Sequence, residues 1–109
     1  MCGIIATKGK NHFHDEIIGK MLESLAHRGP DERKFVRIND TTLGQTRLSI
    51  VDLSEGNQPM RDNEKSMTIV FNGEIYDYKN LRLDLEAKGH IFRTQSDTEV
   101  ILKSYIQYG

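Results

Sequence analysis

The chain has 109 residues, 37% of them hydrophobic and 28% charged, which is ordinary for one globular domain or part of one. Its 15 basic and 16 acidic residues give a net charge of −1, so nothing favours binding to nucleic acid or to an anionic membrane. A single cysteine excludes an intrachain disulfide and a thiolate zinc cluster. Because no signal peptide or membrane-spanning run is recognisable, we expect a cytoplasmic protein.

The first predicted element is a strand over residues 2–7, an apolar run that contains β-branched Ile4 and Ile5. It begins with Cys2, directly after Met1. Removal of Met1 would leave Cys2 with a free α-amine. Since amines and thiols of this kind titrate near neutrality, the amine could activate the thiol as a nucleophile. The alternative is that Cys2 is only a small apolar residue of a buried strand.

Residues 15–27 predict a helix with one face in the core. Its apolar residues recur at helical spacing and are Ile17, Ile18, Met21, Leu22 and Leu25. Gly29 and Pro30 end the helix. Upstream, His12 and His14 stand two residues apart without a matching set of carboxylates or thiolates. We interpret these histidines as loop residues and expect no metal site.

Alternating and β-branched residues predict three further strands, over residues 33–39, 41–50 and 66–71. Asn39-Asp40 is typical of a turn, so the first two of these strands should form a hairpin. Glycine and proline predict a loop over residues 51–63. The third strand should end at Asn72-Gly73.

A second helix is predicted over residues 78–88. Asp77 is suited to cap its first turn and Gly89 to close its last. Leu81 and Leu85 should face inward.

A brief strand over residues 91–94 and a third helix complete the predicted elements. Ser96 and Glu99 have the spacing of a capping box, which places the helix start there. The buried stripe of this helix should consist of Val100, Ile101 and Tyr105. Helices that flank strands without regular alternation predict an α+β fold.

Five segments form one pattern in chain order. They are Cys2-Gly3-Ile4, His27-Arg28-Gly29-Pro30-Asp31, Gly44-Gln45-Thr46-Arg47-Leu48-Ser49-Ile50-Val51-Asp52, Asn72-Gly73-Glu74-Ile75-Tyr76 and Ser96-Asp97-Thr98-Glu99. The pattern spans nearly the whole chain and resembles the glutaminase domain of class II glutamine amidotransferases. Within that group it resembles the glutamine-hydrolysing asparagine synthetases, and Pro30 favours this branch over the enzymes of purine or hexosamine synthesis. The family usually has asparagine where this chain has Asp77, a change that preserves helix capping.

The resemblance implies an N-terminal-nucleophile hydrolase fold, a four-layer α/β/β/α sandwich, of which this chain is expected to cover only the N-terminal part. Residues 1–109 would then be a partial type-2 glutamine amidotransferase domain. The implied reaction is hydrolysis of L-glutamine to glutamate and ammonia, the glutaminase half of asparagine biosynthesis. It needs no cofactor. ATP and Mg are expected only in a synthetase domain, which would be a partner in the full-length protein and is missing here.

The resemblance also implies the catalytic residues. Cys2 would attack the side-chain amide of glutamine to form a thioester. The Asn72 side chain and the Gly73 N–H would form the oxyanion hole, whose donors stabilise the charge of the tetrahedral intermediate. A simpler interpretation of Asn72-Gly73 is an ordinary turn.

The same resemblance implies the substrate-binding residues. Arg47 would hold the α-carboxylate through its planar fork, and Glu74 and Asp97 would hold the α-ammonium. Backbone groups next to Arg47 would line the pocket, at Leu48, Ser49, Ile50 and Val51. Taken singly, Arg47 could be a surface charge, and Asp97 could merely favour a helix N-terminus.

A competing interpretation is a non-catalytic fragment that acts at most as a glutamine-binding or dimerising module. Uncovered strand edges would favour a homodimer or larger assembly. Retention of Met1 would also block the activating amine of Cys2.

Overall fold

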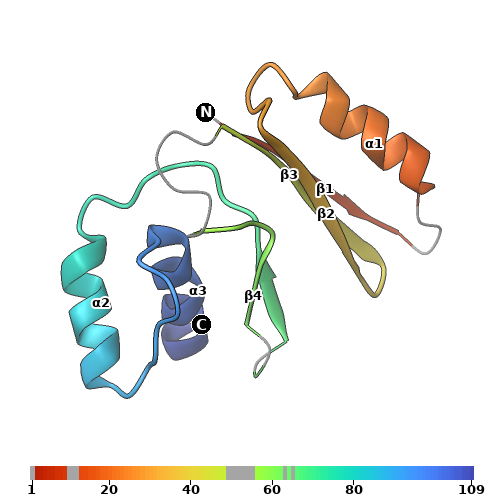
Figure 1. Cartoon of the computed structure of the whole chain (residues 1–109). Coiled ribbons are helices and arrows are strands. Elements are labelled where there is room, and N and C mark those ends of the chain that lie inside the picture. The colour runs from red at the N-terminus through yellow and green to blue at the C-terminus, as the bar shows by residue number, and fades with distance from the viewer. Residues whose placement is uncertain (1, 10–12, 49–55, 63, 65) are drawn as a thin grey trace.

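The computed structural model describes residues 2–9, 13–48, 56–62, 64 and 66–109. Its elements, in chain order, are β1 (Gly3–Lys8), α1 (Asp15–Ser24), β2 (Glu32–Ile38), β3 (Thr41–Arg47), β4 (Met60–Asp62), β5 (Met67–Ile69), α2 (Tyr78–Ala87) and α3 (Asp97–Tyr108). The fold is a mixed α+β arrangement with antiparallel sheets (Figure 1). No helix among the described residues is long and apolar enough to cross a membrane.

The first layer is a three-stranded antiparallel sheet in the order β1-β3-β2, with α1 along one face (Figure 1). Gly44 of β3 pairs with Ile5 on one side and Phe35 on the other. A Cβ at Gly44 would lie 2.8 Å from the Ile5 side chain, so the glycine leaves the room that Ile5 and Phe35 fill. Ile5 packs there with Ile18 and Leu22 of α1, and these three form the core of this layer.

The second layer contains the β4–β5 hairpin, packed against α3, which in turn packs against α2 (Figure 1). Its buried apolar residues come from three elements and are Met60, Leu85, Val100 and Leu102. The loop that joins the hairpin to α2 crosses the side of this layer nearest the end of β3, whereas the loop after α2 begins at the opposite end and runs back to the start of α3 (Figure 1).

Most predicted elements are confirmed, namely the first strand, the hairpin with its turn at Asn39-Asp40, and the three helices. The strand predicted over residues 66–71 is shorter, Met67–Ile69. The loop predicted over residues 51–63 contains β4, which pairs with β5. The strand predicted over residues 91–94 is wrong, because its backbone N–H groups at Arg93 and Thr94 donate to the Glu99 carboxylate instead of to a strand.

Two predicted helix faces also need correction. Ile17 is 42% exposed, while Ile18 and Leu22 carry the buried face of α1. Tyr105 is 60% exposed, and Leu102 occupies the core of α3 in its place.

The predicted helix caps form only in part. Ser96 caps α3 by accepting the Thr98 N–H, but Glu99 binds the preceding loop rather than completing a capping box. Asp77 stands at the start of α2 without a capping bond, and its Oδ1 accepts from the Asn80 side chain.

Candidate active site

Cys2 lies at the start of β1, partly buried, with its backbone fixed by neighbouring bonds. The Arg28 side chain donates to the Cys2 carbonyl at 3.2 Å, and the Gly3 N–H donates to Thr46 Oγ1 at 3.0 Å. A Cβ at Gly3 would lie 2.8 Å from that oxygen and 2.9 Å from Leu25 Cβ. Glycine after the cysteine is therefore needed for β1 to lie this close to β3 and to the end of α1.

Arg47 is the last residue of β3 and lies next to Cys2. Since Gly3 pairs with Thr46 and side chains alternate along a strand, Cys2 and Arg47 are on the face of the sheet that points away from α1. The Arg47 guanidinium donates from Nη1 to Asn57 Oδ1 at 2.9 Å.

The segment that follows α1 wraps the end of β3. The Asp31 N–H donates to the Arg47 carbonyl at 3.0 Å, and Pro30 forms a parallel bridge with Arg47. A Cβ at Gly29 would lie 2.5 Å from the Arg47 backbone nitrogen. The Gly29-Pro30-Asp31 motif therefore holds the backbone of Arg47 in place.

The segment from Phe71 to Ile75 is irregular, and Asn72, Gly73 and Glu74 are exposed along it. Side chains hold it at both ends. Gln45 Nε2 donates to the Phe71 carbonyl at 3.2 Å, and the Ile75 N–H donates to Asp97 Oδ2 at 3.2 Å. Asp97 is itself fixed at the first turn of α3.

These segments meet around a cavity of about 200 Å³ between the two layers. It is lined by Cys2, Gln45, Arg47, Gly56, Gln58, Phe71, Asn72, Gly73, Ser96, Asp97 and Thr98. Five of the residues that the sequence singled out are thus brought together from four separate segments, namely Cys2, Arg47, Asn72, Gly73 and Asp97.

The other predicted site residues are placed differently. Glu74 lines an adjacent cavity, which it shares with Asp97. Leu48 is 37% exposed and is not part of the lining of the 200 Å³ cavity. Ser49, Ile50 and Val51 lie outside the described residues, as do Met1 and His12.

Sequence reasoning did not single out Gln45 and Gln58, which are buried at 3% and 8% exposure and line the cavity. A glutamine in a strand or before a proline has no distinctive spacing. Two signals were available for Gln45: it stands in the segment from Gly44 to Asp52 that carries the resemblance, and it alternates in register with Arg47 on β3, which puts both side chains on one face.

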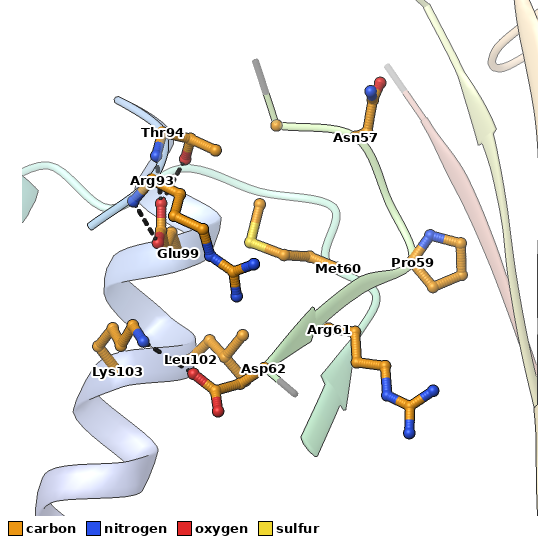
Figure 2. Close-up of a pocket in the computed structure, with 11 residues that line it drawn as sticks. Asn57, Pro59, Met60, Arg61, Asp62, Arg93, Thr94, Glu99, Leu102 and Lys103 are labelled. Atoms are coloured by element: carbon orange, nitrogen blue, oxygen red, sulfur yellow. Dashed lines mark hydrogen bonds and ion pairs between the residues drawn. The ribbon is translucent and has the colours of Figure 1, made fainter. Parts of the chain in front are cut away.

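A second cavity, of about 260 Å³, lies between β4 and α3, and the loop that contains Asn57 also lines it (Figure 2). Its two carboxylates, Asp62 and Glu99, both have partners among the lining residues. Lys103 lies 2.7 Å from Asp62, and both are largely buried. The Glu99 carboxylate accepts three bonds of 2.7–2.8 Å from Arg93 and Thr94, as Figure 2 shows. We interpret this cavity as structural, because Glu99 holds the loop that leads into α3, the helix that carries Asp97.

The 200 Å³ cavity therefore combines a thiol, a guanidinium, an amide side chain and a carboxylate. A guanidinium and a carboxylate in one cavity suit the two charges of an amino-acid backbone, and a thiol is a group that can act as a nucleophile. Among the described residues, no three histidine, cysteine, aspartate or glutamate side chains are grouped so as to hold a metal ion.

The chain is similar to known proteins along its whole length. The family model described as a glutamine amidotransferase domain matches residues 1–109. The chain is 41% identical over 113 residues to asparagine synthetase [glutamine-hydrolyzing] 1 of Bacillus subtilis, covering 99% of this chain and 18% of the relative. It is 39% identical over 112 residues to asparagine synthetase [glutamine-hydrolyzing] 1 of Arabidopsis thaliana, covering 100% of this chain and 19% of the relative. The chain thus spans about a fifth of the length of these relatives.

Proposed function

The chain belongs to the glutamine amidotransferase domain family, and we propose that its cavity between the two layers hydrolyses L-glutamine to glutamate and ammonia. The observation that carries the proposal is the shared lining of Cys2, Arg47, Asn72 and Asp97, which lie far apart in sequence. No cofactor is needed for this reaction.

In the proposed reaction, the Cys2 sulfur attacks the side-chain amide carbon of glutamine, and the free α-amine of Cys2 accepts the thiol proton. The carbonyl oxygen becomes an oxyanion, bound by the Asn72 side-chain amide and the Gly73 N–H. As the C–N bond breaks, the leaving nitrogen takes up a proton and departs as ammonia. Water then attacks the thioester, which releases glutamate and restores the thiol.

The substrate backbone is proposed to lie against Arg47 and Asp97. Arg47 would bind the α-carboxylate with its planar fork, which Asn57 orients through the 2.9 Å bond to Nη1. Asp97 and Glu74 would bind the α-ammonium. Asp97 is oriented for this by the Ile75 N–H on its Oδ2. Backbone groups at Leu48, Ser49, Ile50 and Val51 are proposed to contact the substrate as well, on the family resemblance alone.

The wider setting is also a proposal. Residues 1–109 would be part of a type-2 amidotransferase domain with the four-layer α/β/β/α sandwich of N-terminal-nucleophile hydrolases, located in the cytoplasm. Its identity with asparagine synthetases favours the glutaminase half of asparagine biosynthesis. A synthetase domain that uses ATP and Mg would consume the ammonia.

One observation favours a second candidate, a glutamine-binding or dimerising module without catalysis. Asn72, Gly73 and Glu74 are exposed, whereas oxyanion donors are most effective where water is excluded. In this alternative the pocket binds glutamine and the thiol is idle.

Substitution of Cys2 distinguishes the two candidates. In the intact protein, Cys2→Ala should abolish ammonia release from glutamine, while calorimetry shows glutamine binding close to that of the unmodified protein. A glutamine-like electrophile should label Cys2 in the unmodified protein alone. Hydrolysis that survives in the alanine variant would end the catalytic proposal, and binding without hydrolysis in the unmodified protein would favour the module.

A further inference from the structure

The oxyanion segment lacks the support of regular structure. Residues 71–75 belong to no helix or strand, so their backbone N–H and C=O groups require partners from elsewhere. Asn72 and Gly73 are also exposed, so burial does not hold them in place. Whatever fixes their position must act through the residues on either side.

Two buried glutamines supply that support at Phe71. Gln45 Nε2 donates to the Phe71 carbonyl, and Gln58 Oε1 accepts the Phe71 N–H. Both backbone polar groups of one residue are thus bound by side-chain amides. Gln58 is fixed in turn, because its Nε2 donates to Thr98 Oγ1 at 3.2 Å.

The Phe71 side chain passes this constraint to Gly73. A Cβ at Gly73 would lie 2.9 Å from Phe71 Cζ, so the ring packs directly over the Gly73 backbone. The ring therefore limits movement of the Gly73 N–H.

The two glutamines come from different layers. Gln45 is on β3, two residues from Arg47, in the sheet whose first strand directly follows Cys2. Gln58 precedes β4 and is bound to α3. Phe71 is therefore bound to both layers at once, which fixes its distance from the three-stranded sheet and so from Cys2.

We propose that Gln45 and Gln58 are positioning residues that hold the oxyanion donors of Asn72 and Gly73 at a fixed distance from Cys2, through Phe71. The inference rests on the proposed glutaminase function. Neither glutamine touches substrate in this role. Loss of either bond should weaken transition-state stabilisation and leave substrate binding by Arg47 largely unaffected.

The test compares Gln58→Met and Gln45→Met in the intact protein, since methionine keeps the length of the side chain and removes its hydrogen bonds. Removal of an oxyanion donor lowers kcat by about 100- to 1,000-fold. Because these variants loosen donors and do not remove them, we expect kcat to fall about 10- to 100-fold with KM for glutamine changed less than about threefold. Two variants are used so that a loss of folding in one leaves the other to decide.

Thr42→Val is the matched control. Thr42 is fully buried on β3, the strand that carries Gln45. Its substitution by valine removes one hydrogen bond, which Arg37 donates to the Thr42 hydroxyl. Thr42 does not line the cavity. Its kcat should stay close to that of the unmodified protein even if the midpoint of thermal unfolding falls as much as in the glutamine variants.

Alkylation by iodoacetamide separates thiol reactivity from the oxyanion hole. The thiolate displaces iodide from a saturated carbon, so no oxyanion forms on a carbonyl. The alkylation rate of Cys2 should therefore stay within about twofold in Gln58→Met and Gln45→Met, although turnover falls.

Three results would overturn the inference. These are turnover near the unmodified level in both glutamine variants, an equal loss in Thr42→Val, or a parallel loss of alkylation and turnover. Cys2→Ala, measured in the same assay, separates failure of this inference from failure of the proposed function. An inactive Cys2→Ala with active glutamine variants would refute the positioning role alone, whereas an active Cys2→Ala would refute the proposed function and this inference together.

Discussion

Gly29 is the position where one added methyl group should do most damage to the candidate site. A Cβ there would lie 2.5 Å from the Arg47 nitrogen, 2.6 Å from the Thr46 carbonyl carbon and 2.7 Å from the Arg47 carbonyl carbon. All three are backbone atoms, so no side-chain rotation can relieve the contact. Since carbon atoms pack at about 3.5–4 Å, Gly29→Ala must push the end of β3 away by about 1 Å.

That displacement has two expected effects. Overpacking of this kind costs about 1–3 kcal/mol of the free energy of unfolding. A misplacement of about 1 Å in a substrate-holding group can cost about 100-fold in rate, and Arg47 is such a group in the proposed function. We therefore expect Gly29→Ala to lose about 1–3 kcal/mol and to lower kcat/KM for glutamine by about two orders of magnitude.

The assay measures urea unfolding and ammonia release for Gly29→Ala and for a matched control, Gly19→Ala. Gly19 lies within α1, and a Cβ there meets nothing within 4 Å. Alanine should stabilise that helix by about 0.5–1 kcal/mol and leave turnover unchanged. If Gly29→Ala is as stable and as active as Gly19→Ala, then the end of β3 is not held by this contact and the reasoning is wrong.

Four further predictions concern Arg47, Met1, Asp84 and the sheet edges. Arg47→Lys should weaken glutamine binding at least about tenfold by calorimetry although the charge is kept, since an ammonium lacks the bidentate fork; equal affinities would place the carboxylate elsewhere. Protein shown by intact mass to retain Met1 should not release ammonia from glutamine, because the activating amine is then part of a peptide bond. Hydrogen bonds from Lys88 and Tyr108 lower the pKa of Asp84, so its stabilising contribution is present above the ordinary carboxyl pKa and is lost as the pH falls through the lowered value; NMR titration of Tyr108→Phe should show that pKa shifted upward. The 109-residue chain by itself should self-associate in sedimentation, because among the described residues β1 and β2 are the edge strands of the three-stranded sheet and each pairs with β3 alone; a compact monomer would contradict this.

The sequence predicts well those elements that have a local pattern, such as helical spacing or a turn dipeptide. The helical spacing of Ile18 and Leu22 and the turn at Asn39-Asp40 are local signals, and the structure agrees with both. The strand predicted over residues 91–94 fails because four residues give too little pattern to outweigh a tertiary partner. Glu99, buried and bound to that loop, decides its conformation.

The candidate site follows the same division. Motifs with a chemical reason for their residue types, such as Cys2 with Gly3 and Asn72 with Gly73, were recognised because each motif is contiguous in the chain. Gln45 stands in such a motif, but the motif assigns it no role, since the role comes from a contact with Phe71, which is 26 residues away. Sequence reasoning recovers groups that act on a substrate more readily than groups that hold those groups in place.

The glycines of the motifs also act by positioning other groups. Three glycines at or near the cavity have no room for a side chain, because a Cβ at Gly29, Gly3 or Gly73 would lie within 2.9 Å of a neighbouring atom. Glycine at each position therefore sets a distance. At Gly29 the near atoms belong to the backbone of Thr46 and Arg47, whereas at Gly3 and Gly73 they belong to side chains of Thr46, Leu25 and Phe71. A methyl group at Gly29 should therefore alter the position of Arg47 more than removal of a hydrogen bond at the surface would, because a backbone contact cannot be relieved by rotation of a side chain.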